Sequence, residues 1–415
     1  MIQAVIERCA GIDVGKKFLA VCVMTGPAQE EPYVEGRKFG TVREQLAALR
    51  QWLQSHGCTH VVMESTGCYW KPVLNVLEDD AEYRVRVILA NPQQVKGITG
   101  HKTDPHDARW LAHLLRHGMI RPSFIPPRAL RDLRDFTRRR KQMIEAASQE
   151  RNRVQKLLED ANVKIGDVLS DVFGMSGQLM LEALVDGVLT HIEIAQLARG
   201  TARKKLAELE KALEGHQMRA VHRSLISHCM SHMAFLAREV ELLDTDIRAL
   251  IEQEQLSAAY ELLQTLPGIR ETAAATILAE AGPNMEQFPG EANFSSWAGV
   301  APGNNESAGV RKKAPTVRGN PHLKAALVEA GWSATRTKDC EFRDRYERQK
   351  LRLGHKRALV SAAHLLAIRI YRVLASGQAY ESPNQQLSQR KLQSLRRHHS
   401  RRLRCIDHWL QEAQS

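Results

Sequence analysis

The chain has 415 residues, room for two or three domains, and 59 Lys and Arg against 47 Asp and Glu give it a net charge of +12. This excess favours a polyanionic partner, because basic side chains release counterions when they bind phosphates. Seven dispersed cysteines without a C-x-x-C pair argue against a disulfide scaffold, and the lack of a G-x-x-x-x-G-K-[ST] motif argues against ATP-driven work. No signal peptide and no apolar run near the roughly 18 residues of a membrane span is visible, which predicts a cytoplasmic protein without membrane contact.

The first 90 residues alternate between strand and helix signals. The expected elements are strands over 4–14, 16–24 and 32–42, a helix over 43–57, a strand over 58–65, a helix over 67–81 and a strand over 83–90. Helices are expected from Pro92 onward. The order predicts an α/β domain that begins with antiparallel strands.

Four acidic residues stand at the ends of these elements. Asp13 lies in the run GIDVGKKF, Glu64 ends the run HVVME, and Asp104 and Asp107 open a helix in KTDPHDARWLAHLL. Asp104 and Asp107 share one helical face, and Asp13 and Glu64 can join them only if their strands are neighbours. Such carboxylates are the ligands of a divalent-metal site that cuts phosphodiesters. The simpler alternative for the helical pair is a helix cap and a charge that complements the helix dipole.

Long, charged helices are predicted from about Ala129. Apolar residues repeat there at alternating spacings of three and four, which is a heptad seam. The seam comprises Ile226, Cys229, Met233, Leu236, Val240, Leu243, Ile247 and Leu250. A heptad does not say whose helix the partner is, so an intramolecular helical hairpin and a dimer interface both remain open.

A compact helical segment is predicted from about Leu262. The run TLPGIRETAAATILAEAG has the pattern of a helix–hairpin–helix element, whose turn at Gly268 would offer backbone N–H groups to a phosphate. An ordinary helical turn is the alternative. A polar, basic loop with the single serine Ser307 follows, and Asn320 is expected to cap a helix that has Pro321 at its first position.

The C-terminal end is strongly basic. Residues 354–374 read as an amphipathic helix, and residues 390–404 contain seven Lys or Arg. A solvated tail would have the same composition, but the net charge of the whole chain favours a nucleic-acid clamp.

The order of these motifs resembles that of the DEDD transposases of the insertion sequence 110 family, which are related to the Piv DNA invertases. The resemblance runs through GIDVGKKF, VVMESTGCYW and NPQQVKGITGHKTDPHDARWLAHLL. It continues through LPGIRETAAATILAEAG and FSSWAGVAPGNNESAGVRKKAPTVRGNPHLKAAL. It therefore covers nearly the whole chain.

The resemblance implies an RNase H-like (RuvC-like) α/β N-terminal domain, a long helical or coiled-coil region and a mainly α C-terminal transposase domain. Asp13, Glu64, Asp104 and Asp107 would bind Mg²⁺ or Mn²⁺, and a serine of the C-terminal loop would be a second catalytic group. Many relatives carry two serines and two glycines in that loop. This chain has Glu306-Ser307-Ala308-Gly309, so Ser307 becomes the assigned nucleophile.

The resemblance further implies a recombinase that acts on DNA, is guided by a structured bridge RNA and assembles as a homo-oligomer, a dimer or tetramer, that is nucleoid-associated when bound. The alternative is a metal-dependent, structure-selective nuclease of the Holliday-junction resolvase kind, without a covalent intermediate.

The expected domains are 1–125 (RuvC-like), 126–260 (helical coiled-coil linker), 261–376 (transposase domain) and 377–415 (basic tail). Expected nucleic-acid contacts are Lys102, Arg109, Gly268, Arg311, Lys312, Lys313, Arg318, Lys324, Arg396, Arg397, Arg401 and Arg402.

Overall fold

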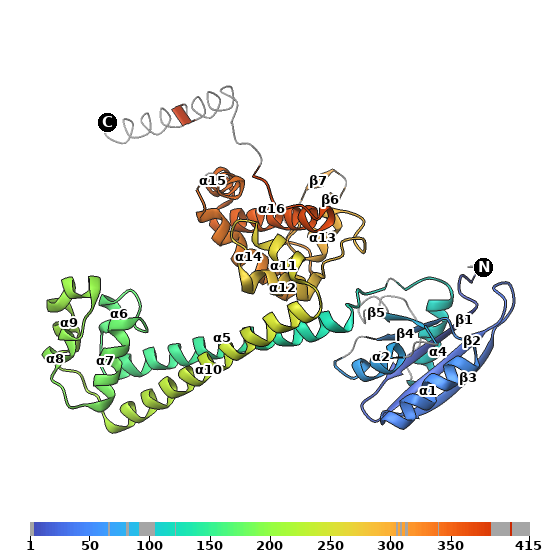
Figure 1. Ribbon diagram of the computed structural model, residues 1–415, viewed down its shortest axis with the longest axis horizontal. Coiled ribbons are helices and arrows are strands. Elements are labelled where there is room, and N and C mark those ends of the chain that lie inside the picture. The colour runs from blue at the N-terminus through green and yellow to red at the C-terminus, as the bar shows by residue number, and fades with distance from the viewer. Residues whose placement is uncertain are drawn as a thin grey trace. The chain divides into compact units, whose positions relative to one another are not determined.

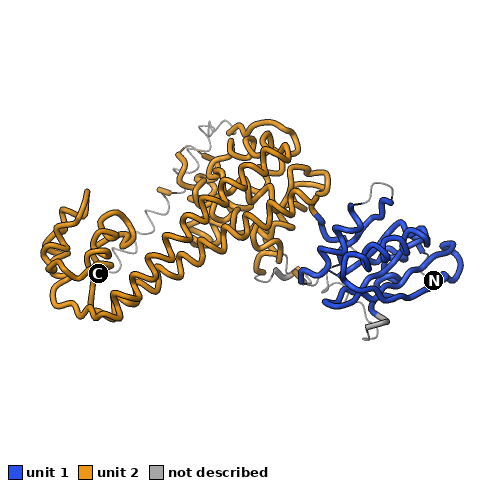
Figure 2. Tube along the Cα trace, turned by 60° about the horizontal axis from the view of Figure 1, so that its bottom comes forward, with its two compact units in different colours: residues 1–125 blue, residues 126–415 orange. Residues whose placement is uncertain are grey.

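The structure is a computed structural model. It describes residues 4–64, 67–79, 83–90, 104–120, 122–303, 306–307, 309–311, 314–338, 340–382 and 399–400. The chain divides into two compact units, residues 1–125 and 126–415 (Figure 2). Several expected nucleic-acid contacts lie outside the described residues: Lys102, Lys312, Lys313, Arg396, Arg397, Arg401 and Arg402.

Unit 1 is built on a five-stranded sheet with the strand order β3-β2-β1-β4-β5 (Figure 1). The strands are β1 (Arg8–Val14), β2 (Phe18–Thr25), β3 (Tyr33–Gly40), β4 (His60–Glu64) and β5 (Arg86–Ala90). The first three pair antiparallel, whereas β4 pairs parallel with both β1 and β5. This order and these directions are those of the RNase H-like fold, so the predicted fold class is confirmed.

Each face of the sheet is covered by helices. On one face, Ile12, Val61 and Met63 pack in a cluster with buried side chains of α1 (Arg43–Ser55) and α2 (Trp70–Glu78). On the other face lies α4 (Asp104–Arg116), whose residues Ala108, Leu111, Ala112, Leu114 and Leu115 are buried. Successive residues of a strand point to opposite faces, so this division assigns a face to every strand residue.

Unit 2 contains two long helices that lie side by side, α5 (Arg128–Asp160) and α10 (Ala220–Gln253) (Figure 1). Three seam residues of α10, Ile226, Leu236 and Ile247, are buried. Their partner in the described structure is α5 of the same chain, which is the intramolecular hairpin. An interface between protomers would have to use other residues of these helices.

The helix pair contains a polar layer. Glu150 of α5 is 6% exposed, and its carboxylate accepts hydrogen bonds from Arg153 and from His232 of α10, the latter at 2.9 Å. Burial alone raises the pKa of Glu150, but the hydrogen bonds from His232 and Cys229 and the charge of Arg153 outweigh it and lower the pKa. A buried, paired polar group of this kind favours one register of two helices over others.

A small helical module connects α5 to α10. It comprises α6 (Ile165–Val168), α7 (Met175–Asp186), α8 (His191–Gln196), the short 3-10 helix η1 (Gly200–Lys205) and α9 (Leu206–Leu213). These helices bury a core of their own, which includes Met180, Leu184 and Leu209 and is joined by Leu158 and Ile226 of the long helices.

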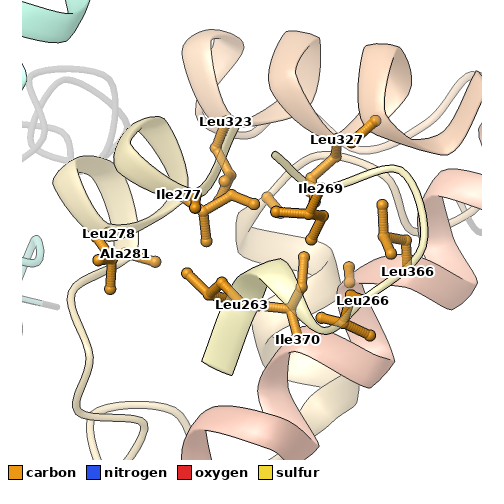
Figure 3. Packing of buried hydrophobic residues seen from close by; sticks show 14 of the residues in the cluster. Leu263, Leu266, Ile269, Ile277, Leu278, Ala281, Leu323, Leu327, Leu366 and Ile370 are labelled. Carbon is orange, nitrogen blue, oxygen red and sulfur yellow. The ribbon is translucent and has the colours of Figure 1, made fainter. Parts of the chain in front are cut away.

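The C-terminal part of unit 2 is a helical core (Figure 3). It is formed by α11 (Ser257–Gln264), α12 (Glu271–Ala281), α13 (Glu291–Trp297), α14 (Pro321–Arg336), α15 (Glu341–Leu353) and α16 (His355–Ser376). Figure 3 shows Ile269, from the loop between α11 and α12, beside Leu327 of α14, and Leu263 of α11 beside Ile370 of α16. The same cluster includes Leu133 of α5 and Ile247 of α10, so both long helices are anchored in it.

Helix α16 differs from the expectation that no segment has the length of a membrane span. It has 22 residues, and an 18-residue window with a mean hydropathy of 1.5 meets the length and composition of one. The helix is nevertheless part of the C-terminal core, where Ala363, Leu366 and Ile370 are fully buried. The core contacts account for its apolar composition.

Candidate active site

Asp13 and Glu64 lie on the face of the sheet that α4 covers. Asp13 is paired with Ala20 on β2, and Glu64 is paired with Ala90 on β5. Both alanines belong to the cluster that packs against α4. Paired residues share a face, so the two half-buried acidic side chains point to the same side at the ends of the neighbouring strands β1 and β4. The condition that their strands be neighbours is met.

Helix α4 brings the other two acidic residues to this face. Asp104 is its first residue, and Asp107, which is half-buried, directly precedes Ala108 in the α4 cluster. The backbone of Asp104 is described but its side chain is not. The C-terminal end of α4 is fixed by Arg116, which is 1% exposed and donates hydrogen bonds to the carbonyl oxygens of Glu7 and Pro27 at 3.0 and 2.7 Å. Closer to the N-terminal end of the helix, Ala108 lies against Gly11 of β1, two residues before Asp13.

The carboxylates suit a hard divalent cation, because Mg²⁺ and Mn²⁺ prefer oxygen ligands. Asp13 and Glu64 provide two such groups on one face. Among the described side chains, no group of three His, Cys, Asp or Glu is close enough to hold a metal ion. Asp13, Glu64 and Asp107 therefore do not form such a group by themselves, and the side chain of Asp104 lies outside the described part. The carboxylates of Asp13 and Glu64 match a metal in ligand type and in their shared face, and the four-residue metal site remains a prediction.

Gly11 permits the close approach of α4 to β1. A Cβ atom at this position would lie 2.2 Å from the carbonyl oxygen of Ala108 and 2.5 Å from the backbone nitrogen of Ala112. We expect Gly11→Ala to destabilise unit 1 by about 1–3 kcal/mol, because α4 must move outward to make room. It should also lower activity, since the acidic residues of α4 move with the helix. Urea unfolding and an activity assay measure the two effects.

Gly36→Ala is the matched control. Gly36 is an exposed residue of β3, and the nearest atom to a Cβ there would be the carbonyl oxygen of Val21 at 3.8 Å. The free energy of unfolding should stay within about 1 kcal/mol of the parent. Equal effects of the two substitutions would contradict the packing role of Gly11.

Ser307 belongs to a loop between α13 and α14 that we call the serine loop, residues 299–320. Near its tip, β6 (Glu306–Ser307) and β7 (Val310–Arg311) form a two-stranded hairpin in which Ser307 pairs with Val310. Gly309 turns the chain between them with a φ of 77°. The backbone of Ser307 is therefore in a defined pairing, whereas its side chain is outside the described part.

The two arms of the serine loop are closed at their base by tight backbone packing. A Cβ on Gly319 would lie 2.4 Å from the backbone nitrogen of Gly299 and 2.4 Å from the carbonyl oxygen of Trp297. The N–H of Asn320 donates to that Trp297 oxygen at 3.0 Å, and Lys324 donates to the Thr316 hydroxyl at 2.7 Å. The base of the loop therefore has a fixed geometry.

Two other serines near this loop, Ser295 and Ser296, lie inside α13 near its end. Ser295 is 0% exposed, and its hydroxyl donates to the carbonyl oxygen of Glu291 at 2.8 Å. It is therefore a structural residue of the helix.

The remaining expected nucleic-acid contacts fall on both units. Arg109 and Arg318 are exposed, Lys324 is half-buried, and Arg311 is described only in its backbone. Gly268 has a φ of 83°, and a Cβ there would lie 2.2 Å from the carbonyl oxygen of Ala330. That close contact with α14 requires a glycine irrespective of any phosphate.

An ionic cluster beside the serine loop was not predicted. Glu280, in α12, is 0% exposed, and it pairs with Arg134 and Arg138 of α5 and with Asn320. The sequence offered one signal, a single charged residue in the mainly apolar run ATILAEAG. Buried carboxylates are rare unless paired, so such a residue is a candidate for a specific role.

Comparisons with known proteins identify the family of the chain. A family model described as a transposase, of the DEDD type of IS110, matches residues 10–163. A second model, described as transposase of the IS116/IS110/IS902 family, matches residues 260–347. Together the two models match more than half of the chain. No curated protein matches it.

Among solved structures, RuvC of Thermus thermophilus is similar at 19% identity, with 28% of this chain and 99% of that chain covered and a TM-score of 0.23. The strand order of unit 1, and not this match, identifies its fold. The range matched by the first model includes positions 13, 64, 104 and 107 of this chain, and the range matched by the second includes position 307. The chain belongs to the IS110 family of transposases, enzymes that cut and rejoin DNA, and has an RNase H-like DEDD domain.

Proposed function

We propose that this transposase cuts and rejoins DNA strands through a covalent bond between DNA and Ser307, assisted by the acidic residues Asp13, Glu64, Asp104 and Asp107. The observation that carries the proposal is the shared face of Asp13 and Glu64, beside the helix that Asp104 opens. The hairpin of Ser307, in a basic loop with a closed base, supports the second part.

The reaction begins with attack of the Ser307 hydroxyl oxygen on a backbone phosphorus. An Oγ–P bond forms, one P–O bond of the DNA breaks, and the proton released by serine ends on the leaving sugar hydroxyl. The phosphodiester is retained as a phosphoserine ester, so a sugar hydroxyl of another strand can reverse the step without ATP. Exposed Arg318 and neighbouring basic residues of the loop would offset the charge on the phosphate.

The four carboxylates would hold Mg²⁺ or Mn²⁺. When bound, such an ion supplies positive charge to phosphate oxygens and lowers the pKa of a coordinated hydroxyl. The proposal holds whether the serine and the carboxylates that act on one phosphate come from one chain or from two copies.

The partners in this proposal are the DNA ends of the element, target DNA and a structured guide RNA, in a homo-oligomer acting on chromosomal DNA in the cytoplasm. The net charge of +12 supports polyanionic partners. The alternative function is a metal-dependent, structure-selective nuclease, which the RNase H-like domain by itself would favour. A denaturation-resistant protein–DNA adduct separates the two, because a nuclease that uses water leaves none.

The test uses labelled DNA that carries the sequence flanking the gene, RNA transcribed from that flank, and Mg²⁺. After incubation and denaturation, the proposed recombinase gives protein bound covalently to one DNA strand. Cleavage without any such adduct would establish the nuclease instead.

Binding to nucleic acid should weaken steeply with salt. The basic run 390–404 contains seven Lys or Arg, so a chain ending at residue 389 should lose up to about six units of the log–log salt slope on duplex DNA. Fluorescence anisotropy across a salt series measures the slope.

A chain that ends at residue 404 is the control for this truncation. It keeps the basic run and should retain the parental slope. If the chain ending at 389 has the same slope as this control, the run is solvated surface and makes no phosphate contacts.

A further inference from the structure

Glu280 is the most deeply buried acidic group among the described residues, and its charge is fully paired. It is 0% exposed. Arg138 donates to its two carboxylate oxygens from Nε at 2.8 Å and from Nη2 at 2.9 Å. The Nε of Arg134 is 3.3 Å away. A buried carboxylate without such partners would be strongly unfavourable, so the three side chains form one unit.

The carboxylate of Glu280 is ionised in this surrounding. Burial alone raises the pKa of Glu280, but hydrogen bonds from Arg138 and Asn320 and the charge of Arg134 outweigh it and lower the pKa. Burial also lowers the pKa of Arg134 to about 10, which leaves it protonated at neutral pH. Arg134 donates in addition to the carbonyl oxygen of Ala279 at 2.7 Å, so α5 also holds the end of α12.

Asn320 links this cluster to the serine loop. Its Nδ2 donates to Glu280 at 2.7 Å. Its Oδ1 accepts from the backbone N–H groups of His322 and Leu323 at 3.0 and 3.2 Å, which caps α14. Its own N–H donates to the carbonyl oxygen of Trp297, the last residue of α13, close to where the other arm of the loop begins. A helix cap needs only the oxygen of this side chain, so the nitrogen serves the bond to Glu280.

We propose that Glu280 is a positioning residue for Ser307, because its carboxylate joins Arg138 of α5 to Asn320 and so fixes where the arms of the serine loop leave the helical core. Helix α5 starts three residues after the end of unit 1. The cluster therefore ties the serine loop to the segment that directly follows the DEDD domain in the chain. The inference rests on the proposed role of Ser307.

Glu280→Gln tests this role, because it keeps the shape of the side chain and removes its charge. At a temperature where the variant is folded, the rate of adduct formation at saturating DNA should fall about 10- to 100-fold, as expected for a displaced nucleophile. The DNA concentration for half-maximal rate should stay within about twofold, since the exposed basic residues are intact. If Glu280 had a purely structural role, the substitution would lower the fraction of folded protein, and the folded molecules would form the adduct at the parental rate.

Asp244→Asn is the matched control. Asp244 of α10 also accepts two hydrogen bonds from an arginine of α5, from Arg140 at 2.6 and 3.0 Å, but the pair makes no described contact with the serine loop. It should leave the rate of adduct formation within about twofold of the parent. Equal losses in the two variants would overturn the positioning role.

Asn320→Ser provides a second test if Glu280→Gln does not fold. Serine is a good helix cap but is too short to reach Glu280, so α14 is retained and the link is lost. It should show the same loss of rate. A parental rate in Asn320→Ser, or in folded Glu280→Gln, overturns the positioning role alone. Absence of an adduct from the parent protein overturns the proposed nucleophile, and the positioning role with it.

Discussion

Replacement of Ser307 by alanine should abolish the covalent protein–DNA adduct and lower strand exchange by about 10⁴-fold or more, because the attacking oxygen is removed. Binding of DNA should remain, since the basic residues are untouched. The measurement is denaturing electrophoresis of labelled flanking DNA after incubation with protein, RNA and Mg²⁺. Ser307→Cys should retain little activity, because a thiol attacks phosphorus poorly.

Ser296→Ala is the control for this substitution. Ser296 lies in α13 beside the serine loop, so the same hydroxyl is removed from a neighbouring position. The adduct should form at the parental rate. An adduct that persists in Ser307→Ala would place the nucleophile elsewhere, and its loss in Ser296→Ala would reopen the choice of serine.

Asp13→Asn and Asp107→Asn should each reduce adduct formation by at least about 10²-fold while the protein stays folded. Without a cation, neighbouring carboxylates repel one another, so removal of one charge should leave the Tm unchanged or slightly higher. Mn²⁺ should raise the Tm of the parent and raise that of the variants less, because the ion binds only the intact carboxylate set. Differential scanning fluorimetry gives this second readout independently of activity.

Glu44→Gln is the matched control within unit 1. Glu44 is an exposed acidic residue in the first turn of α1. Its variant should keep both the activity and the Mn²⁺-dependent rise in Tm. Parental recombination in Asp13→Asn and Asp107→Asn would refute the metal site, as would a Glu44→Gln variant with the same loss of metal response.

The architecture of unit 1 could be predicted because local patterns determine it. The strand signals of the first 90 residues predicted all five strands, although β1, β3 and β5 are three or four residues shorter than the expected runs 4–14, 32–42 and 83–90. Asp13 and Glu64 could be expected to lie close together only if their two strands were neighbours in the sheet. The strands are neighbours, because β4 pairs with β1. That pairing joins distant parts of the chain, and no local sequence pattern encodes it.

Features that depend on long-range partners were less predictable. The heptad seam of α10 was evident, but its partner was not, because a hairpin and a dimer present the same spacing. The short helices α6 to α9 have no pattern long enough to reveal that they bury a core. Glu280 resembled an ordinary residue near a helix end, because its pairing with Arg138 spans 142 positions of the sequence.

The long helices α5 and α10 leave one core and return to it. Leu133 near the start of α5 and Ile247 near the end of α10 pack in the same C-terminal cluster, whereas Val154 and Ile226 at their other ends pack with the small helical module. The rest of the two helices, together with the small helical module, therefore resembles a long insertion in a surface loop. Removal of seven residues from each long helix would keep the heptad positions of the two helices in register. It would also bring the small helical module closer to the C-terminal core along the helix pair. A chain shortened in this way would keep both the DEDD domain and the serine loop unchanged.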